Sequence, residues 1–82
     1  MTTPLSAQER RSLLETARQA IARELAGRPQ AAPESDGVFA RRSGVFVSLH
    51  NRGELRGCIG DPDGEQPLGV TVPRCAVAAA TA

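Results

Sequence analysis

The hydrophobic positions in the first third of the chain repeat at helical spacing. Ser6 followed by Glu9 has the spacing of a capping box, which marks the start of a helix. Gly27 is a candidate C-cap, and Pro29 cannot continue a helix. The pattern predicts an amphipathic helix over about 6–26 that packs through one apolar stripe. The stripe consists of Leu13, Leu14, Ala17, Ala20, Ile21 and Leu25.

A polar connection rich in proline and glycine follows, over about 27–37. Positions 38–40 are apolar and fit either a short edge strand or a loosely packed segment. Arg41 and Arg42 come next. Two adjacent arginines are typical of a solvated loop, and a phosphate-binding role is the alternative.

Apolar and polar residues then alternate with a period of two between about 44 and 60, which predicts a β-hairpin. We expect a three-residue loop, Asn51 to Gly53, with Gly53 in the left-handed region. That loop places the aliphatic residues on one face, with a glycine as the exception, whereas a two-residue loop would shift one strand by one position. The expected pairs are Val45 with Ile59, Phe46 with Cys58, Val47 with Gly57, Ser48 with Arg56, Leu49 with Leu55, and His50 with Glu54.

The second strand of this hairpin carries the most unusual residues of the chain. In the expected register Arg56 and Cys58 lie on one face, while Leu55 and Ile59 point to the core. Gly57 then lies on the core side, where another segment can approach the backbone closely.

The segment over about 67–82 is predicted to be helical, because Pro67 suits a first helical turn and the following apolar residues keep helical spacing. Pro73 removes a backbone donor, so one kinked helix and two pieces, 67–72 and 73–82, are both compatible with the pattern. The alanine-rich end has no C-cap signal. We therefore expect the chain to be the N-terminal part of a larger domain.

Composition limits the chain to one small domain with a thin core. It has 82 residues, two Phe, and no Tyr or Trp. The net charge of +1 gives no strong attraction to nucleic acid or to an anionic membrane. All ten basic residues are arginine, and alanine is frequent, which suggests a high-GC, bacterial coding sequence.

The cysteines and the compartment can be considered together. The chain shows no signal segment and no apolar run approaching the ~20 residues of a membrane span. We therefore expect a cytoplasmic protein with reduced thiols, with a disulfide between Cys58 and Cys75 as the alternative. The spacing of the cysteines does not fit zinc, and the acidic residues over 61–65 fail the EF-hand pattern. We expect no metal and no cofactor.

The hexapeptide LRGCIG over 55–60 is the most specific motif. Together with LLETARQAI from Leu13 to Ile21 and the later PL and AVAAA segments, it resembles the AMME chromosomal region gene 1 protein domain. Bacterial members of that family are called AmmeMemoRadiSam system protein A. The resemblance implies an α+β domain with two subdomains, of which this chain is the N-terminal part, and a signature segment near a cleft. It also implies partnership with a Memo-type protein and a radical S-adenosylmethionine protein.

The signature supplies the candidate site residues. Cys58 is the candidate catalytic residue, because a thiolate near a cation gains reactivity; the alternative is a half-buried cysteine packed under Phe46. Arg56 could bind an anionic ligand through its planar fork or pair with a nearby carboxylate. Gly57 and Gly60 are candidate ligand-binding positions, and backbone geometry is their alternative role.

The resemblance and these residues together leave three candidate functions. The first is a component of an AmmeMemoRadiSam enzyme system with a site around Arg56 and Cys58 and an unspecified reaction. The second is a non-catalytic module that binds nucleic acid or protein through Arg41, Arg42 and Arg56. The third is an inactive truncated fragment.

Overall fold

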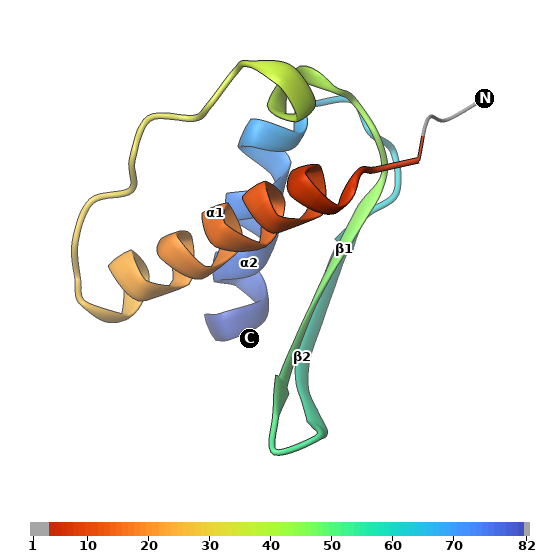
Figure 1. Ribbon diagram of the computed structural model, residues 1–82. Coiled ribbons are helices and arrows are strands. Elements are labelled where there is room, and N and C mark those ends of the chain that lie inside the picture. Colours follow the sequence, from red (N-terminus) through yellow and green to blue (C-terminus); the bar gives the residue numbers. More distant parts are fainter. Residues whose placement is uncertain (1–3, 82) are drawn as a thin grey trace.

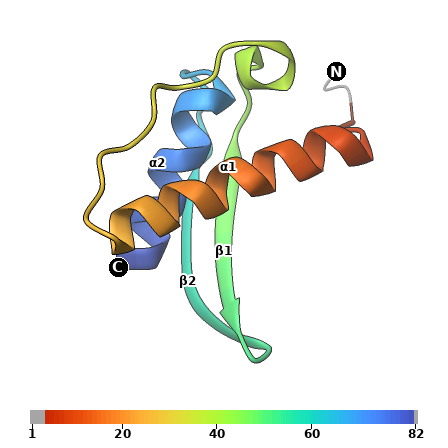
Figure 2. The same ribbon diagram turned by 60° about the vertical axis from the view of Figure 1, so that its left-hand side comes forward.

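The computed structural model describes residues 4–81. The elements follow one another as α1 (Ala7–Leu25), the 3-10 helix η1 (Gly37–Ala40), β1 (Val45–Asn51), β2 (Glu54–Asp61) and α2 (Leu68–Thr81). Helix α2 occupies the middle, with α1 across one side of it and the β1–β2 hairpin along the other (Figures 1 and 2). The predicted α+β class is confirmed.

Both ends of α1 carry the signals seen in the sequence. The Ser6 hydroxyl accepts from the Glu9 N–H at 3.0 Å, and the Glu9 carboxylate accepts from the Ser6 N–H at 2.9 Å, which completes the capping box. At the other end Gly27 has φ 67°, and the Arg28 N–H donates to the Arg23 carbonyl at 2.8 Å. This left-handed residue ends the helix and turns the chain into the linker.

The apolar stripe of α1 is narrower than its sequence suggests. Ala17 and Ala20 are buried, while Leu14 and Leu25 are 54% and 74% exposed. Small residues therefore make the closest contact with α2, and the contact covers only part of the stripe.

Helix α2 supplies most of the core. It runs as one helix through Pro73, so the division into two pieces was wrong. Its buried row packs with Ala17 of α1 and with η1, and the partly buried Val45 and Val47 of β1 lie against the same cluster. The row consists of Leu68, Gly69, Thr71, Val72, Cys75, Ala76 and Ala79.

The segment before the hairpin forms η1, neither an edge strand nor a loosely packed segment. Val38 and Phe39 are 7% and 8% exposed and belong to the core cluster. The Leu68 N–H donates to the Arg41 carbonyl at 2.8 Å, which ties the end of η1 to the start of α2.

The turn of the hairpin has two residues, so the expected three-residue loop was wrong. Arg52 and Gly53 have φ 54° and 81°, and Asn51 pairs with Glu54. Two consecutive positive φ values define the tight turn that best matches the twist of a hairpin. Gly53 is left-handed as expected, but Arg52 shares that conformation.

The register also differs from the expected one. His50 pairs with Leu55 and Leu49 with Gly57, so Arg56 is the extra residue of a β-bulge. Beyond the bulge the pairs are Ser48 with Cys58, Val47 with Ile59, Phe46 with Gly60 and Val45 with Asp61. The shorter turn and the bulge together shift the pairing by two positions, which restores the expected alternation of faces.

The half-buried residues of β1 and β2 still share the face against α2 as a result. These residues are Val45, Val47, Leu49, Gly57, Ile59 and Asp61. Leu55 is the exception: it is 60% exposed and does not point to the core. Within residues 4–81, neither helix is long and apolar enough to cross a bilayer.

Candidate functional site

The side of the hairpin turned away from α2 carries the candidate nucleophile. We call this side the outer face; it comprises Phe46, Ser48, His50, Cys58 and Gly60, all of them exposed. The Ser48 hydroxyl lies 3.4 Å from the Cys58 sulfur in hydrogen-bonding geometry. Cys58 is therefore an accessible thiol beside a hydroxyl donor, and the alternative of a half-buried cysteine under Phe46 was wrong.

Gly57 lies on the inner side of β2, where the last turn of α2 reaches the strand. A Cβ atom added at Gly57 would overlap the backbone carbonyl oxygen of Ala79. The close backbone approach expected at this glycine is thus made by α2. Gly57 allows the helix to sit directly on the strand, and this contact fixes the inner side of the hairpin.

Gly60 has a different neighbour, on the outer face. Phe46 is its cross-strand partner, and the Phe46 ring occupies the space that a Cβ of Gly60 would need. The ring nonetheless remains 68% exposed. A ring laid over a facing glycine shields the backbone there, so this glycine has a packing role in addition to its candidate ligand role.

Arg56 occupies the bulge and pairs with its neighbour on β2. Its guanidinium lies 3.4 Å from the Glu54 carboxylate, and the two side chains are 60% and 72% exposed. Such an exposed pair contributes little to stability. The expected pairing of His50 with Glu54 was wrong, because His50 faces Leu55.

The second cysteine, Cys75, lies in α2, on the side of the hairpin away from Cys58. Cys75 is 3% exposed in α2, and burial raises the pKa of its thiol. Both cysteines are free thiols, so the disulfide alternative was wrong.

Next to Cys75, the Arg74 guanidinium forms an ion pair with the Asp61 carboxylate at 2.5 Å and holds the pKa of that carboxyl below its usual value. This ion pair joins α2 to the end of β2.

The remaining charged candidates do not gather at the outer face. The Arg42 guanidinium donates to the Glu65 carbonyl at 2.9 Å, beside the start of β1, whereas Arg56 lies near the turn at the far end of the hairpin. Within the part of the chain that the structure describes, no three side chains of the His, Cys, Asp and Glu type come together as metal ligands.

Ser48 is the site residue that the sequence reasoning missed. The expected register placed it opposite Arg56, whereas the bulge brings it opposite Cys58. A polar residue in the middle of the first strand was the available signal. Its partner depended on the turn and the bulge together.

The fold and the site define a class: an α+β domain in which a central helix supports a hairpin with an exposed, glycine-flanked cysteine. A model of the AMMECR1 family matches residues 14–82. The chain belongs to the AMMECR1 family, as the LRGCIG resemblance predicted.

Two relatives extend this comparison. A protein of Methanothermobacter thermautotrophicus is 44% identical over 80 residues, which is 95% of this chain and 42% of the relative. A protein of Methanococcoides burtonii is 46% identical over 44 residues, which is 54% of this chain and 22% of the relative. The chain thus spans less than half the length of either relative. Both relatives are archaeal, so the expected bacterial source stays a prediction.

Proposed function

We propose that the chain is part of an AmmeMemoRadiSam-type enzyme system and that the outer face of its hairpin is the functional surface. The observation that carries the proposal is the pairing of an exposed Cys58 sulfur with the Ser48 hydroxyl at 3.4 Å. Cysteine is the most nucleophilic common side chain once it is deprotonated, and the Ser48 hydroxyl donates to the sulfur of this cysteine. The site residues are therefore Cys58 as nucleophile and Ser48 as its donor.

The bulged strand gives Arg56 and the two glycines supporting roles in this proposal. Arg56, two residues before Cys58 on the same strand, would leave its weak, exposed pair with Glu54 to bind an anionic group on the side of Cys58 nearer the turn. Gly57 holds the strand against α2, and Gly60 lets the Phe46 ring lie across the strand on the outer face. In the longer relatives, we expect the part that this chain does not span to supply a general base.

The binding-module alternative receives less support from the structure. Arg42 is engaged with a backbone carbonyl at one end of the hairpin, and Arg56 lies at the other end, so the two do not form one basic patch. Nucleic-acid binding usually needs several cations that follow the phosphate backbone together. A protein partner at the outer face is the form of this alternative that remains compatible with the geometry.

The chemical role is tested by alkylation of Cys58 with iodoacetamide as a function of pH, in a Cys75→Ala background. We expect Ser48→Ala to slow alkylation at neutral pH by up to about fivefold, which corresponds to the ~1 kcal/mol of one hydrogen bond. Ser43→Ala, at a position before β1 where the hydroxyl donates to the Gly44 carbonyl, is the matched control and leaves the rate unchanged. Equal rates for Ser48→Ala and Ser43→Ala would refute the role of Ser48.

The partner role needs a separate measurement. A purified Memo-type protein or radical S-adenosylmethionine protein is added, and protection of Cys58 from alkylation is followed. We expect protection at Cys58, while a cysteine placed on exposed α1 by Glu24→Cys stays reactive. If both positions react at the same rate with and without the partners, the outer face is not their contact surface.

A further inference from the structure

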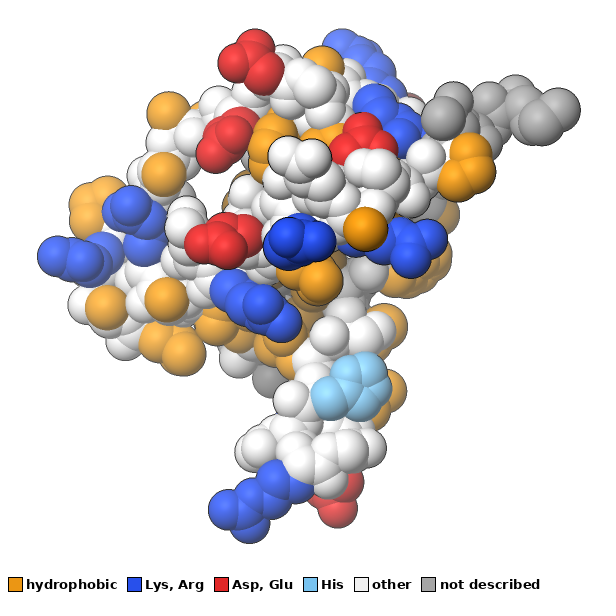
Figure 3. Space-filling view, viewed as in Figure 1, with side chains coloured by type: hydrophobic (Ala, Val, Ile, Leu, Met, Phe, Trp, Pro, Cys, Tyr) orange, Lys and Arg blue, Asp and Glu red, His pale blue; other side chains and the backbone are white. Residues whose placement is uncertain are grey.

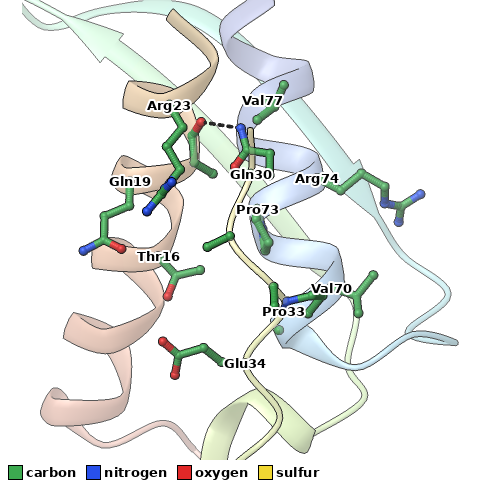
Figure 4. A pocket seen from close by; sticks show the side chains of 14 residues that line it. Thr16, Gln19, Arg23, Gln30, Pro33, Glu34, Val70, Pro73, Arg74 and Val77 are labelled. Atoms are coloured by element: carbon green, nitrogen blue, oxygen red, sulfur yellow. Dashed lines mark hydrogen bonds between the residues drawn. The ribbon is translucent and has the colours of Figure 1, made fainter. Parts of the chain in front are cut away.

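The linker between α1 and η1 forms a strap over a cavity that is separate from the hairpin. The cavity has a volume of about 350 Å³ and lies between α1, strap residues 30–34 and α2. Figure 3 shows an opening between the strap and the body of the molecule, and Figure 4 shows the side chains around it. We call this cavity the strap pocket. Its size is at the lower end of the range for small-molecule sites.

The strap is fastened at both ends, which keeps the pocket open beneath it. At one end, the Gln30 side-chain amide donates to the Ala20 carbonyl at 2.9 Å, and the Arg23 guanidinium donates to the Pro29 carbonyl at 3.2 Å. At the other end, the Glu34 backbone crosses directly over Gly69, where any side chain would overlap it. Between these fastenings the strap stands away from both helices.

The two helices give the pocket unlike walls. The α1 wall is polar and consists of Thr16, Gln19 and Arg23, which share one helix face. The α2 wall is mostly apolar, with Val70, Pro73 and Val77, and Arg74 borders it with its guanidinium turned away to pair with Asp61 (Figure 4). Figure 4 shows the two rows facing each other across the strap residue Pro33. A ligand with one apolar side and one hydrogen-bonding side matches these walls.

Opposite charges mark the two ends of the pocket. Arg23 lies at the end near Gln30, and the Glu34 carboxylate extends toward Thr16 at the other end (Figure 4). Thr16 and Arg23 are two helical turns apart, which is about 10 Å along α1. One guanidinium N–H donates to the Pro29 carbonyl, and four of its five donors are left for other acceptors. The charges favour a ligand with a carboxylate at one end and an ammonium group at the other.

We propose that the strap pocket binds a free tripeptide with small apolar side chains. Three extended residues span about 10 Å, which is comparable to the length of α1 between Thr16 and Arg23. The peptide carboxylate would pair with Arg23, its ammonium group with Glu34, and its central side chain would lie on Val70 and Val77. This proposal does not depend on Cys58 or on the outer face.

Titration of the labelled chain with Ala-Val-Ala, followed by NMR, tests the proposal. We expect saturable shifts over residues 30–34 and 69–77, with a Kd of about 0.1–1 mM for a ligand of this size. Blocking the ligand as its C-terminal amide, or as its N-acetyl form, is expected to weaken binding about tenfold. Absence of saturable shifts up to about 10 mM, or equal binding of the free and doubly blocked peptides, would overturn the proposal.

Two variants test which end of the peptide each charged residue binds. Arg23→Gln is expected to weaken the free tripeptide about tenfold but to leave its C-terminal amide unchanged, and Arg23→Lys to restore part of the difference. Glu34→Gln has the corresponding effect on the ammonium end, which the N-acetyl peptide reports. Arg18→Gln, on the same helix but outside the pocket, is the control. A loss that is the same for free and blocked peptides would show that these residues only hold the strap.

Discussion

The contact between Gly57 and α2 gives the sharpest test of how the hairpin is held. In Gly57→Ala the new Cβ would overlap the Ala79 carbonyl oxygen, which is part of the helix backbone and cannot rotate away. The helix and the strand must separate, and overpacking of this kind costs about 1–3 kcal/mol. The core cluster that includes Val72 and Ala76 loses packing at the same time.

Gly60→Ala is the matched control, since it makes the same substitution on the same strand. The atoms it would overlap belong to the Phe46 ring, which is 68% exposed and can turn about its side-chain bonds. The gain of up to about 1 kcal/mol from replacing a strand glycine is common to both variants and cancels between them. We expect Gly57→Ala to be less stable than Gly60→Ala by about 2 kcal/mol.

Thermal unfolding followed by far-UV circular dichroism measures this difference. For a chain of this size, about 2 kcal/mol corresponds to a Tm difference of roughly 8–16 °C. Ala79→Gly is not expected to rescue Gly57→Ala, because the overlapping atom is the carbonyl oxygen, which Ala79→Gly retains. Equal Tm values for Gly57→Ala and Gly60→Ala, or full rescue by Ala79→Gly, would refute the direct seating of α2 on the strand.

Three further tests address the rest of the structure. Ser6→Ala removes one half of the capping box and is expected to lower the free energy of unfolding by about 1 kcal/mol, measured by thermal melting. Ser6→Asp, which also caps a helix, is expected to keep the stability of the native chain. The lowered pKa of Asp61 means that its pair with Arg74 stabilises the fold above the ordinary carboxyl pKa of 3.8 and is lost as pH falls through the folded value. Asp61→Asn is therefore expected to reduce the loss of Tm below about pH 4, and an unchanged pH profile would contradict this. In the native chain a thiol reagent is expected to label Cys58 about a hundredfold faster than the buried Cys75, with equal rates after unfolding; comparable native rates would show that α2 opens readily.

The features that depend on near neighbours could be predicted from the sequence. The capping box at Ser6 and the left-handed Gly27 involve residues within one helical turn of each other, so their spacing alone identifies them. The existence of the hairpin also follows from local alternation. The exposure of Leu14 did not follow, because it depends on how far α2 covers α1.

The register could not be predicted, because two shifts of one position in the same direction leave nearly the same residues on the inner face. A two-residue turn alone would have moved one strand by one position, which is why the three-residue loop was preferred. The bulge at Arg56 adds the second shift, and no glycine or proline at that position signals it. The strap pocket was also invisible in the sequence, since it depends on where the linker touches α1 and α2.

The bulge determines the chemistry of the candidate site. In the expected register Arg56 would lie beside Cys58 and Leu55 would lie in the core. The actual register exposes Leu55 and brings Ser48 opposite Cys58. The thiol therefore lies between two exposed apolar side chains, Phe46 at 68% and Leu55 at 60%. A partner that covers these side chains would also exclude water from the sulfur and strengthen its hydrogen bond with Ser48. Under the proposed function, contact with a partner and the environment of the thiol would then be coupled at this face.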